Sequence, residues 1–217
     1  MWKTIINLLF PINCLNCKKE GEFICSSCFK KIEINKKFYF DKTDILKKTI
    51  VVGNNDDDLL KQAIYRYKYD FIKDLSKPLG KLMVIKLKKV IPRKIRNDIV
   101  FIPIPLHPKR LRWRGFNQSE LLAQEINQKL NIPVVNNLLI RTKYALPQVK
   151  VQKSFQRWKN INNVFGLNLE MNSGIVRNKI IIIVDDISTT GATLKEAARI
   201  LNTLKPKQIW GLVLKKD

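Results

Sequence analysis

Two adjacent carboxylates followed by a run of hydroxyl side chains form the most distinctive chemistry in the chain, at residues 185–193 (DDISTTGAT), here called the acid–hydroxyl segment. Its polar and small residues are Asp185, Asp186, Ser188, Thr189, Thr190, Gly191, Ala192 and Thr193. Vicinal ribose hydroxyls can donate hydrogen bonds to such a pair of carboxylates, which can also reach Mg²⁺ through water. The hydroxyls would lie where a helix begins, and the free N–H groups of a helix start point at anions. This order of groups predicts a ribose 5-phosphate as the ligand.

A simpler interpretation of the same segment is an acidic turn followed by a helix with a Ser or Thr cap. A cap uses one hydroxyl, whereas this segment has four of them around a glycine. The apolar run at residues 180–184 predicts a buried strand before the acids. Because ligands collect at the carboxyl ends of strands in open parallel sheets, the strand–turn–helix context favours a ligand site.

All the cysteines of the chain lie close together, in the pattern C-x2-C-x7-C-x2-C. They are Cys14, Cys17, Cys25 and Cys28. Two CxxC knuckles can complete a tetrahedral zinc site, and a site made of cysteines alone predicts structural zinc. A redox dithiol pair and reduced core cysteines are the alternatives. A secreted disulfide scaffold would spread its bridges through the chain, so the clustering indicates a reducing compartment.

The apolar pattern predicts helices and strands that alternate along most of the chain. Helices are expected over residues 59–67, 75–83, 117–130 and 193–204, and strands over residues 98–104, 132–135, 179–184 and 209–214. Such alternation is typical of an α/β fold with a parallel sheet. Residues 36–58 are weakly patterned, and residues 105–115 are expected to form a basic loop.

Charge is the unusual feature of the composition, with 41 Lys and Arg against 18 Asp and Glu, a formal net charge of +23. Such an excess suits a polyanionic partner: nucleic acid, a phosphorylated ligand or an anionic membrane surface. A genome of biased base composition would also enrich Lys, Ile and Asn, so the net charge alone does not identify a partner. No apolar run approaches the ~18–20 residues of a membrane span, and the short apolar start lacks a cleavage site. The expectation is a cytoplasmic protein, with peripheral contact to a membrane left open.

Four separate stretches resemble the ComF family of competence-associated, phosphoribosyltransferase-like proteins. They are LLFPINCLNC with the later CSSC, YRYKYDFIKDL, IPIPLHPKRLRWRGFNQSELLA, and QRWKNINNVF with the apolar run and acid–hydroxyl segment. The resemblance implies a type I phosphoribosyltransferase-like parallel sheet flanked by helices, over residues 36–217, and an N-terminal helix with a small Cys₄ zinc ribbon, over residues 1–35. It further implies 5-phosphoribosyl-1-pyrophosphate (PRPP) with Mg²⁺ as the ligand, and a part in DNA uptake for natural transformation.

By its position between a strand and a helix, the basic stretch at residues 105–115 resembles the pyrophosphate loop of phosphoribosyltransferases. The residues expected to hold the pyrophosphate are Leu106, His107, Lys109 and Arg110, with Arg112 and Arg114 as further cations. Guanidinium groups suit phosphate oxygens because their fork can donate two parallel hydrogen bonds. His107 is the only histidine, and a loop hydrogen bond is the preferred interpretation over acid–base catalysis.

The stretch at residues 141–163 carries six Lys or Arg and no acid. Arg157 and Asn160 match the family pattern there, and a long polar stretch inside a compact domain is typical of a functional lid. We expect a flap that closes over the ligand. Its cations and aromatics could also track a strand of DNA, although core packing explains the aromatics equally well.

Three functions remain open from the sequence. The first is a competence-type protein that binds PRPP or a nucleotide together with single-stranded DNA, beside DNA-uptake machinery at the inner face of the membrane. The second is an active Mg²⁺-dependent phosphoribosyltransferase with an unknown acceptor, although no base-binding hood or general base is recognisable. The third is a ligand sensor without turnover. Ammonia production from glutamine is not expected, because Trp2 stands where amidophosphoribosyltransferases carry a cysteine nucleophile.

Overall fold

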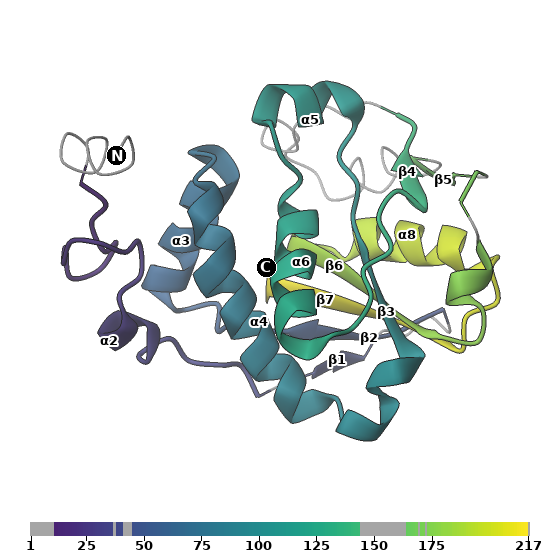
Figure 1. Cartoon of the computed structure of the whole chain (residues 1–217), viewed down its shortest axis with the longest axis horizontal. Helices are drawn as coiled ribbons and strands as arrows, with labels where there is room; N and C mark the ends of the chain where they lie inside the picture. Colours follow the sequence, from purple (N-terminus) through teal and green to yellow (C-terminus); the bar gives the residue numbers. More distant parts are fainter. Residues whose placement is uncertain are drawn as a thin grey trace.

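A computed structural model describes residues 11–36, 38–40, 45–143, 164–168, 170–171 and 173–216 (Figure 1). The helices are α2 (Ser26–Phe29), α3 (Asp58–Tyr69), α4 (Ser76–Val90), α5 (Pro108–Arg114), α6 (Gln118–Leu130) and α8 (Ala192–Asn202). The strands are β1 (Phe38–Phe40), β2 (Leu46–Val51), β3 (Ile99–Pro103), β4 (Leu139–Arg141), β5 (Phe165–Leu167), β6 (Ile180–Ser188) and β7 (Gln208–Lys216). Short 3₁₀ turns occur at Lys73–Leu75, Arg93–Asp98 and Ser173–Val176.

A five-stranded sheet with the order β1-β2-β7-β6-β3 forms the centre of the molecule. β2, β7, β6 and β3 run parallel to their neighbours, whereas β1 pairs with β2 in the antiparallel sense. β3 and the first half of β6 are continuous apolar runs, because helices cover both faces of the sheet. The predicted α/β fold with a parallel sheet is confirmed.

Two apolar layers hold β6 in place, one on each face of the sheet. Ile180, Ile182 and Val184 belong to one cluster of buried residues, and Ile181 and Ile183 belong to a second cluster. This alternation follows from the two-residue period of a strand. The first cluster includes apolar residues of α3, α4 and α6, and the second includes those of α8 (Figure 1). The packing therefore fixes the polar residues at the carboxyl end of β6.

Most of the predicted elements are confirmed. The predicted helices correspond to α3, α4, α6 and α8, and the strands predicted over residues 98–104, 179–184 and 209–214 correspond to β3, β6 and β7. The strand predicted over residues 132–135 is wrong, because only a single parallel bridge joins Val134 to Phe101. The backbone of Pro133 has no N–H group to continue a ladder.

The predicted basic loop at residues 105–115 is also corrected, since most of it is the helix α5. The side chain of His107 caps this helix, with Nδ1 accepting a hydrogen bond from the backbone N–H of Lys109 at 3.2 Å. Pro108 occupies the first turn, where its fixed φ favours a helix. Gly115 ends the helix in the left-handed conformation, with φ of 79°.

The cysteine segment packs against the helical layer that contains α3 and α4. Leu15, Ile24 and Ile32 belong to the same cluster of buried residues as Leu60 and Leu79. The predicted domain boundary at residue 35 stays a prediction. In the described part of the chain, none of the helices has the length and apolar character needed to cross a membrane.

Candidate functional site

The acid pair lies inside β6 rather than after it, which corrects the predicted strand end at Val184. β6 pairs with β7 as far as Ser188 opposite Lys216, but its last partner on β3 is Pro103, opposite Val184. Because β3 ends there, one edge of the acid-bearing half of β6 has no strand partner among the described residues. That edge faces the loops that follow β3.

Asp185 is partly buried and is held by its neighbours. Its Oδ1 atom accepts a hydrogen bond from Ser119 Oγ at 3.0 Å and another from the backbone N–H of Asp186 at 2.9 Å. Burial raises the pKa of Asp185 to about 7, and the charge of Asp186 raises it further, while Lys68 and Ser119 act in the opposite direction. A carboxyl group with this pKa exchanges its proton near neutral pH.

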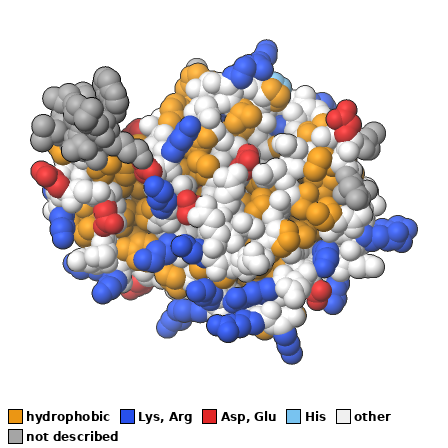
Figure 2. Space-filling model, viewed as in Figure 1, with side chains coloured by type: hydrophobic (Ala, Val, Ile, Leu, Met, Phe, Trp, Pro, Cys, Tyr) orange, Lys and Arg blue, Asp and Glu red, His pale blue; other side chains and the backbone are white. Residues whose placement is uncertain are grey.

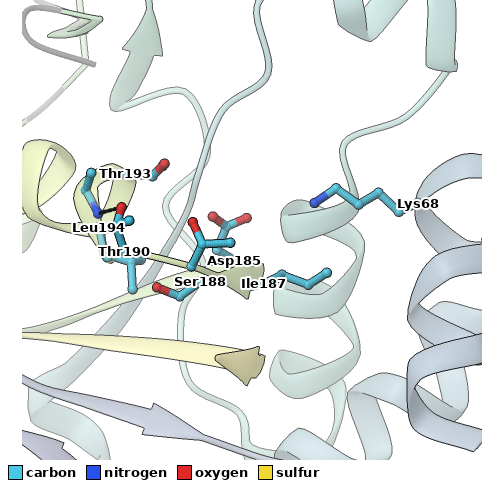
Figure 3. Close-up of a pocket in the computed structure, with 10 residues that line it drawn as sticks. Lys68, Asp185, Ile187, Ser188, Thr190, Thr193 and Leu194 are labelled. Atoms are coloured by element: carbon cyan, nitrogen blue, oxygen red, sulfur yellow. Dashed lines mark hydrogen bonds between the residues drawn. The ribbon is translucent and has the colours of Figure 1, made fainter. Parts of the chain in front are cut away.

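Asp186 is buried and forms an ion pair with a lysine from a distant element. Its Oδ1 atom lies 3.5 Å from Nζ of Lys68, near the end of α3, and accepts a hydrogen bond from the N–H of Ile187 at 2.7 Å. The charge of Asp186 raises the pKa of Lys68 against the opposing effect of burial. Figure 3 shows the lysine side chain pointing toward the acid-bearing end of β6. Lys68 was not predicted as a site residue, although it lies in the YRYKYDFIKDL stretch.

The hydroxyl residues form the wall of an open pocket where β6 passes into α8. Gly191 begins this helix with φ of 77°, a conformation that favours glycine. Thr190 Oγ1 accepts a hydrogen bond from the N–H of Ala192 at 3.4 Å. The pocket measures about 410 Å³ including solvent at its mouth (Figure 3). Its lining residues are Lys68, Asp185, Ile187, Ser188, Thr189, Thr190, Gly191, Ala192, Thr193 and Leu194.

The four residues predicted to hold a pyrophosphate are not among those that line this pocket. Leu106 and His107 lie between β3 and α5, and Lys109 and Arg110 lie in the first turn of α5. Burial, followed by the charge of Arg110, lowers the pKa of Arg141 at the end of β4. A group of cations therefore lies between α5 and β4, and its role in binding pyrophosphate stays a prediction.

The predicted flap residues Arg157 and Asn160 lie outside the described residues. The described residues on either side of that stretch form the antiparallel pair β4–β5. Thr142 continues this pairing, with its backbone N–H donating to the carbonyl of Val164 at 2.9 Å. The flap assignment stays a prediction.

The four cysteines converge as the spacing predicts. Their Sγ atoms all lie within 4.8 Å of one another, and all four thiols are free of disulfides. Cys14 Sγ accepts from the N–H of Cys25 at 3.5 Å, and Cys28 Sγ accepts from Nδ2 of Asn16 at 3.3 Å. Such donors orient and stabilise thiolates around a metal. Four sulfur ligands without a water position suit a structural zinc ion.

The family of phosphoribosyl transferase domains matches residues 117–214. The match begins at Asn117, which caps α6, and ends inside β7. It contains the whole acid–hydroxyl segment and Ser119. Lys68 and the cysteines precede it.

Three bacterial relatives match more of the chain. Competence protein F of Haemophilus influenzae is 28% identical over 94% of this chain and 97% of its own length. Competence protein ComFC of Bacillus subtilis is 31% identical over 67% of this chain and 54% of its own length. DNA utilization protein YhgH of Escherichia coli K12 is 28% identical over 70% of this chain and 66% of its own length. The chain thus spans nearly all of the first relative but only about half to two thirds of the other two. The match to phosphoribosyl transferase domains, the relatives named as competence proteins and the cysteine cluster together support a phosphoribosyltransferase-like protein of the ComF family.

Proposed function

We propose that the chain binds PRPP or a nucleotide in the pocket at the end of β6, and single-stranded DNA on its basic surface, during DNA uptake for natural transformation. The observation that carries the ligand proposal is the arrangement of Asp185, Lys68 and the hydroxyls around one pocket, with Asp186 paired to Lys68 behind them. The family match to phosphoribosyl transferase domains supports it.

The pocket offers separate groups for the two halves of a ribose 5-phosphate. The carboxylates of Asp185 and Asp186 can accept hydrogen bonds from the ribose hydroxyls. Ser188, Thr190 and Thr193 can donate to the 5′-phosphate, together with the free N–H groups at the start of α8. Gly191 has no side chain, so the phosphate can approach the backbone closely. Lys68 contributes a positive charge at the same mouth.

Two metals belong to the proposal. Mg²⁺ would enter with PRPP and offset the charge of its pyrophosphate. Zinc would be held by the four cysteine thiolates and would serve the structure of the N-terminal segment. For the pyrophosphate we retain Leu106, His107, Lys109 and Arg110, and for the flap Arg157 and Asn160, as proposed contacts.

The DNA part of the proposal rests on charge and on the relatives. The net charge of +23 suits a nucleic-acid backbone, and the relatives are named as competence and DNA utilization proteins. We place the protein in the cytoplasm, at the inner face of the membrane and beside the DNA-uptake machinery.

Calorimetry with PRPP and Mg²⁺ tests the ligand site. The wild-type chain should bind, and the double variant Asp185→Asn/Asp186→Asn should not. Asp74→Asn serves as the matched control, because its exposed carboxylate pairs with Lys77 away from the pocket. Equal binding by the wild type and the double variant would remove the assignment.

Titration of a labelled single-stranded oligonucleotide at several salt concentrations tests the DNA site. The expected plot of log K against log salt falls steeply, with a slope of about −0.7 for each neutralised phosphate. Absence of binding at low salt would disprove the DNA part and leave the PRPP part standing.

The second candidate function is an active phosphoribosyltransferase. It is favoured by the pKa of Asp185, which burial raises to about 7 beside the proposed ribose site, because a group that titrates near neutral pH is suited to proton transfer. Pyrophosphate release from PRPP with a panel of nucleobases is the test. Release that the Asp185→Asn/Asp186→Asn variant does not reduce would exclude this function.

A further inference from the structure

Three aromatic side chains near the ligand pocket are exposed to solvent. Trp113 of α5 is 69% exposed, and Tyr65 and Tyr69 of α3 are 58% and 44% exposed. Large aromatic rings are usually at least partly buried, so a group of exposed rings indicates a binding surface. The two tyrosines lie one helical turn apart, with ring centroids separated by 4.9 Å.

Phe71 and Arg114 connect these rings to each other. The ring of Trp113 packs edge-on against that of Phe71, with centroids 4.8 Å apart and an interplanar angle of 85°. The guanidinium carbon of Arg114 lies 5.3 Å from the centroid of Phe71. One nitrogen of the same guanidinium, Nη2, donates to the carbonyl of Lys68 at 2.8 Å. The hydrogen bond of Arg114 therefore links α5 to the end of α3, and the contact with Phe71 orients the Trp113 ring.

The same contacts place the aromatics beside the pocket. The backbone carbonyl of Lys68 accepts the hydrogen bond from Arg114, while the side chain of Lys68 lines the pocket and pairs with Asp186. Tyr69 is the next residue after Lys68. Burial lowers the pKa of the Arg114 guanidinium, and the nearby Tyr69 acts in the opposite direction, so Tyr69 also lies close to Arg114. A chain that lies on Trp113 and Tyr69 would thus run along the mouth of the ligand site.

The charge along α5 is positive, whereas Asp70 beside Tyr69 is paired with Arg66. Lys109, Arg110 and Arg112 belong to the same turn-and-a-half of α5 as Trp113, and the helix contains no acid. Figure 2 shows Lys and Arg side chains next to hydrophobic ones over the region that α5 occupies in Figure 1. Aromatic rings set among cations are the arrangement that binds single strands, because bases stack on the rings and phosphates contact the cations.

We infer that Tyr65, Tyr69 and Trp113 form a stacking platform for single-stranded DNA, with the cations of α5 along its backbone. The inference deepens the proposed function, since it locates the DNA contact on described residues rather than on the flap. Double-stranded DNA would not stack on these rings, because its bases are already stacked on one another.

The first test compares Trp113→Leu, Trp113→Phe and a control in titrations of a fluorescent oligothymidylate. Leucine keeps apolar bulk but removes the π face, so we expect binding at least about fivefold weaker, from the ~1–3 kcal/mol of one stacked base. Phenylalanine keeps a ring and should bind within about twofold of the wild type. Phe40→Leu is the matched control: this ring is 79% exposed on β1, at the opposite edge of the sheet from β3.

Calorimetry with PRPP checks that Trp113→Leu leaves the ligand site intact. A wild-type chain that binds no oligothymidylate would overturn the DNA part of the proposed function. A wild type and a Trp113→Leu variant that bind it equally would overturn the platform alone. Loss of binding to phosphatidylglycerol vesicles in Trp113→Leu, with DNA binding retained, would assign the surface to a membrane and also overturn the platform.

Tryptophan fluorescence gives a second readout that a merely structural role would not change. Stacking of a base on Trp113 should quench part of the protein emission when oligothymidylate is added. The Trp113→Phe variant should bind the oligonucleotide but lose that part of the quenching. Undiminished quenching in this variant would contradict the stacking of bases on Trp113.

Discussion

The Nζ atom of Lys68 lies 3.5 Å from Oδ1 of Asp186, although 118 positions separate the two residues in the chain. Lys68 belongs to α3, which precedes the region that matches phosphoribosyl transferase domains. The segment before that region thus supplies a cation to the acid pair. This cation offsets part of the repulsion between Asp185 and Asp186, which would otherwise disfavour a doubly ionised site.

Replacing Lys68 with methionine should weaken PRPP binding by about tenfold or more. A charge-assisted hydrogen bond contributes ~1.5–3 kcal/mol, and the variant would lose both that contact and the ionisation of the acid pair that the ammonium supports. Calorimetry with Mg²⁺ measures the change. Lys61→Met, which removes an exposed partner of Asp58 on the same helix, should bind normally. Unchanged affinity in Lys68→Met would show that the ammonium has no part in the site.

Asp185→Asn should change how stability depends on pH. In the folded chain Asp185 keeps its proton up to a pKa of about 7, whereas its ordinary value is 3.8. Between these values the unfolded chain binds fewer protons at this position, so the free energy of unfolding falls as pH rises. Asparagine does not titrate, and this loss should disappear in the variant.

Thermal melts between pH 4 and 8 measure this effect. The melting temperature of Asp185→Asn relative to that of the wild type should rise up to about pH 7 and then level off. Asp74→Asn is the control, because its carboxylate is exposed. Parallel curves for Asp185→Asn and the wild type would contradict the raised pKa.

Removing a cysteine should release the metal and destabilise the chain. Cys14 is fully buried, and Cys14→Ser should reduce bound zinc well below one ion per chain. Because neighbouring residues pack with the core of α3 and α4, we expect the melting temperature to fall by more than about 4 °C. Asn16→Ala removes only a hydrogen bond to Cys28, so zinc should remain with about tenfold lower affinity. A metal-free wild type would disprove the zinc assignment.

Gly80→Ala tests the contact between α4 and α6. A Cβ atom at Gly80 would lie 2.5 Å from Cβ of Glu125, so the helices would have to separate. Helix propensity alone favours alanine by about 1 kcal/mol, but overpacking costs ~1–3 kcal/mol. We expect net destabilisation in chemical denaturation. Gly166→Ala, whose nearest neighbour would be 3.4 Å away, should have a smaller effect. A Gly80→Ala variant more stable than the wild type would show that α4 and α6 can move apart without cost.

Local patterns predicted the parts of the site that are contiguous in sequence. The acid–hydroxyl segment and the cysteine cluster each lie within one short stretch, so each group of residues could be predicted to come together without a fold. Lys68 could not be predicted in the same way, because its contact with Asp186 depends on how α3 packs against the sheet. The contact between the Ser119 hydroxyl and Asp185 likewise depends on how α6, which Asn117 caps, packs against β6.

Several short elements were not predicted, and in two of them, β2 and α5, the side chains obscure the usual periods. β2 contains Lys48, whose Nζ lies 3.7 Å from the centroid of the Trp210 ring, so a lysine takes part in packing. α5 has Arg114 as its only buried residue and lacks an apolar face. Pro108 and Gly115 were the available signals for α5, since they mark its start and its end.

The order of the sheet limits how the chain can be divided. The region that matches phosphoribosyl transferase domains begins at residue 117, yet β7 pairs on one side with β2 and β6 pairs on one side with β3, and both partners precede residue 117. A fragment cut at that point would expose the outer edges of its two central strands, which favours aggregation. The boundary of the family match and the boundary of the sheet therefore differ in this protein, and the pocket at the end of β6 includes Lys68 from the N-terminal half of the chain.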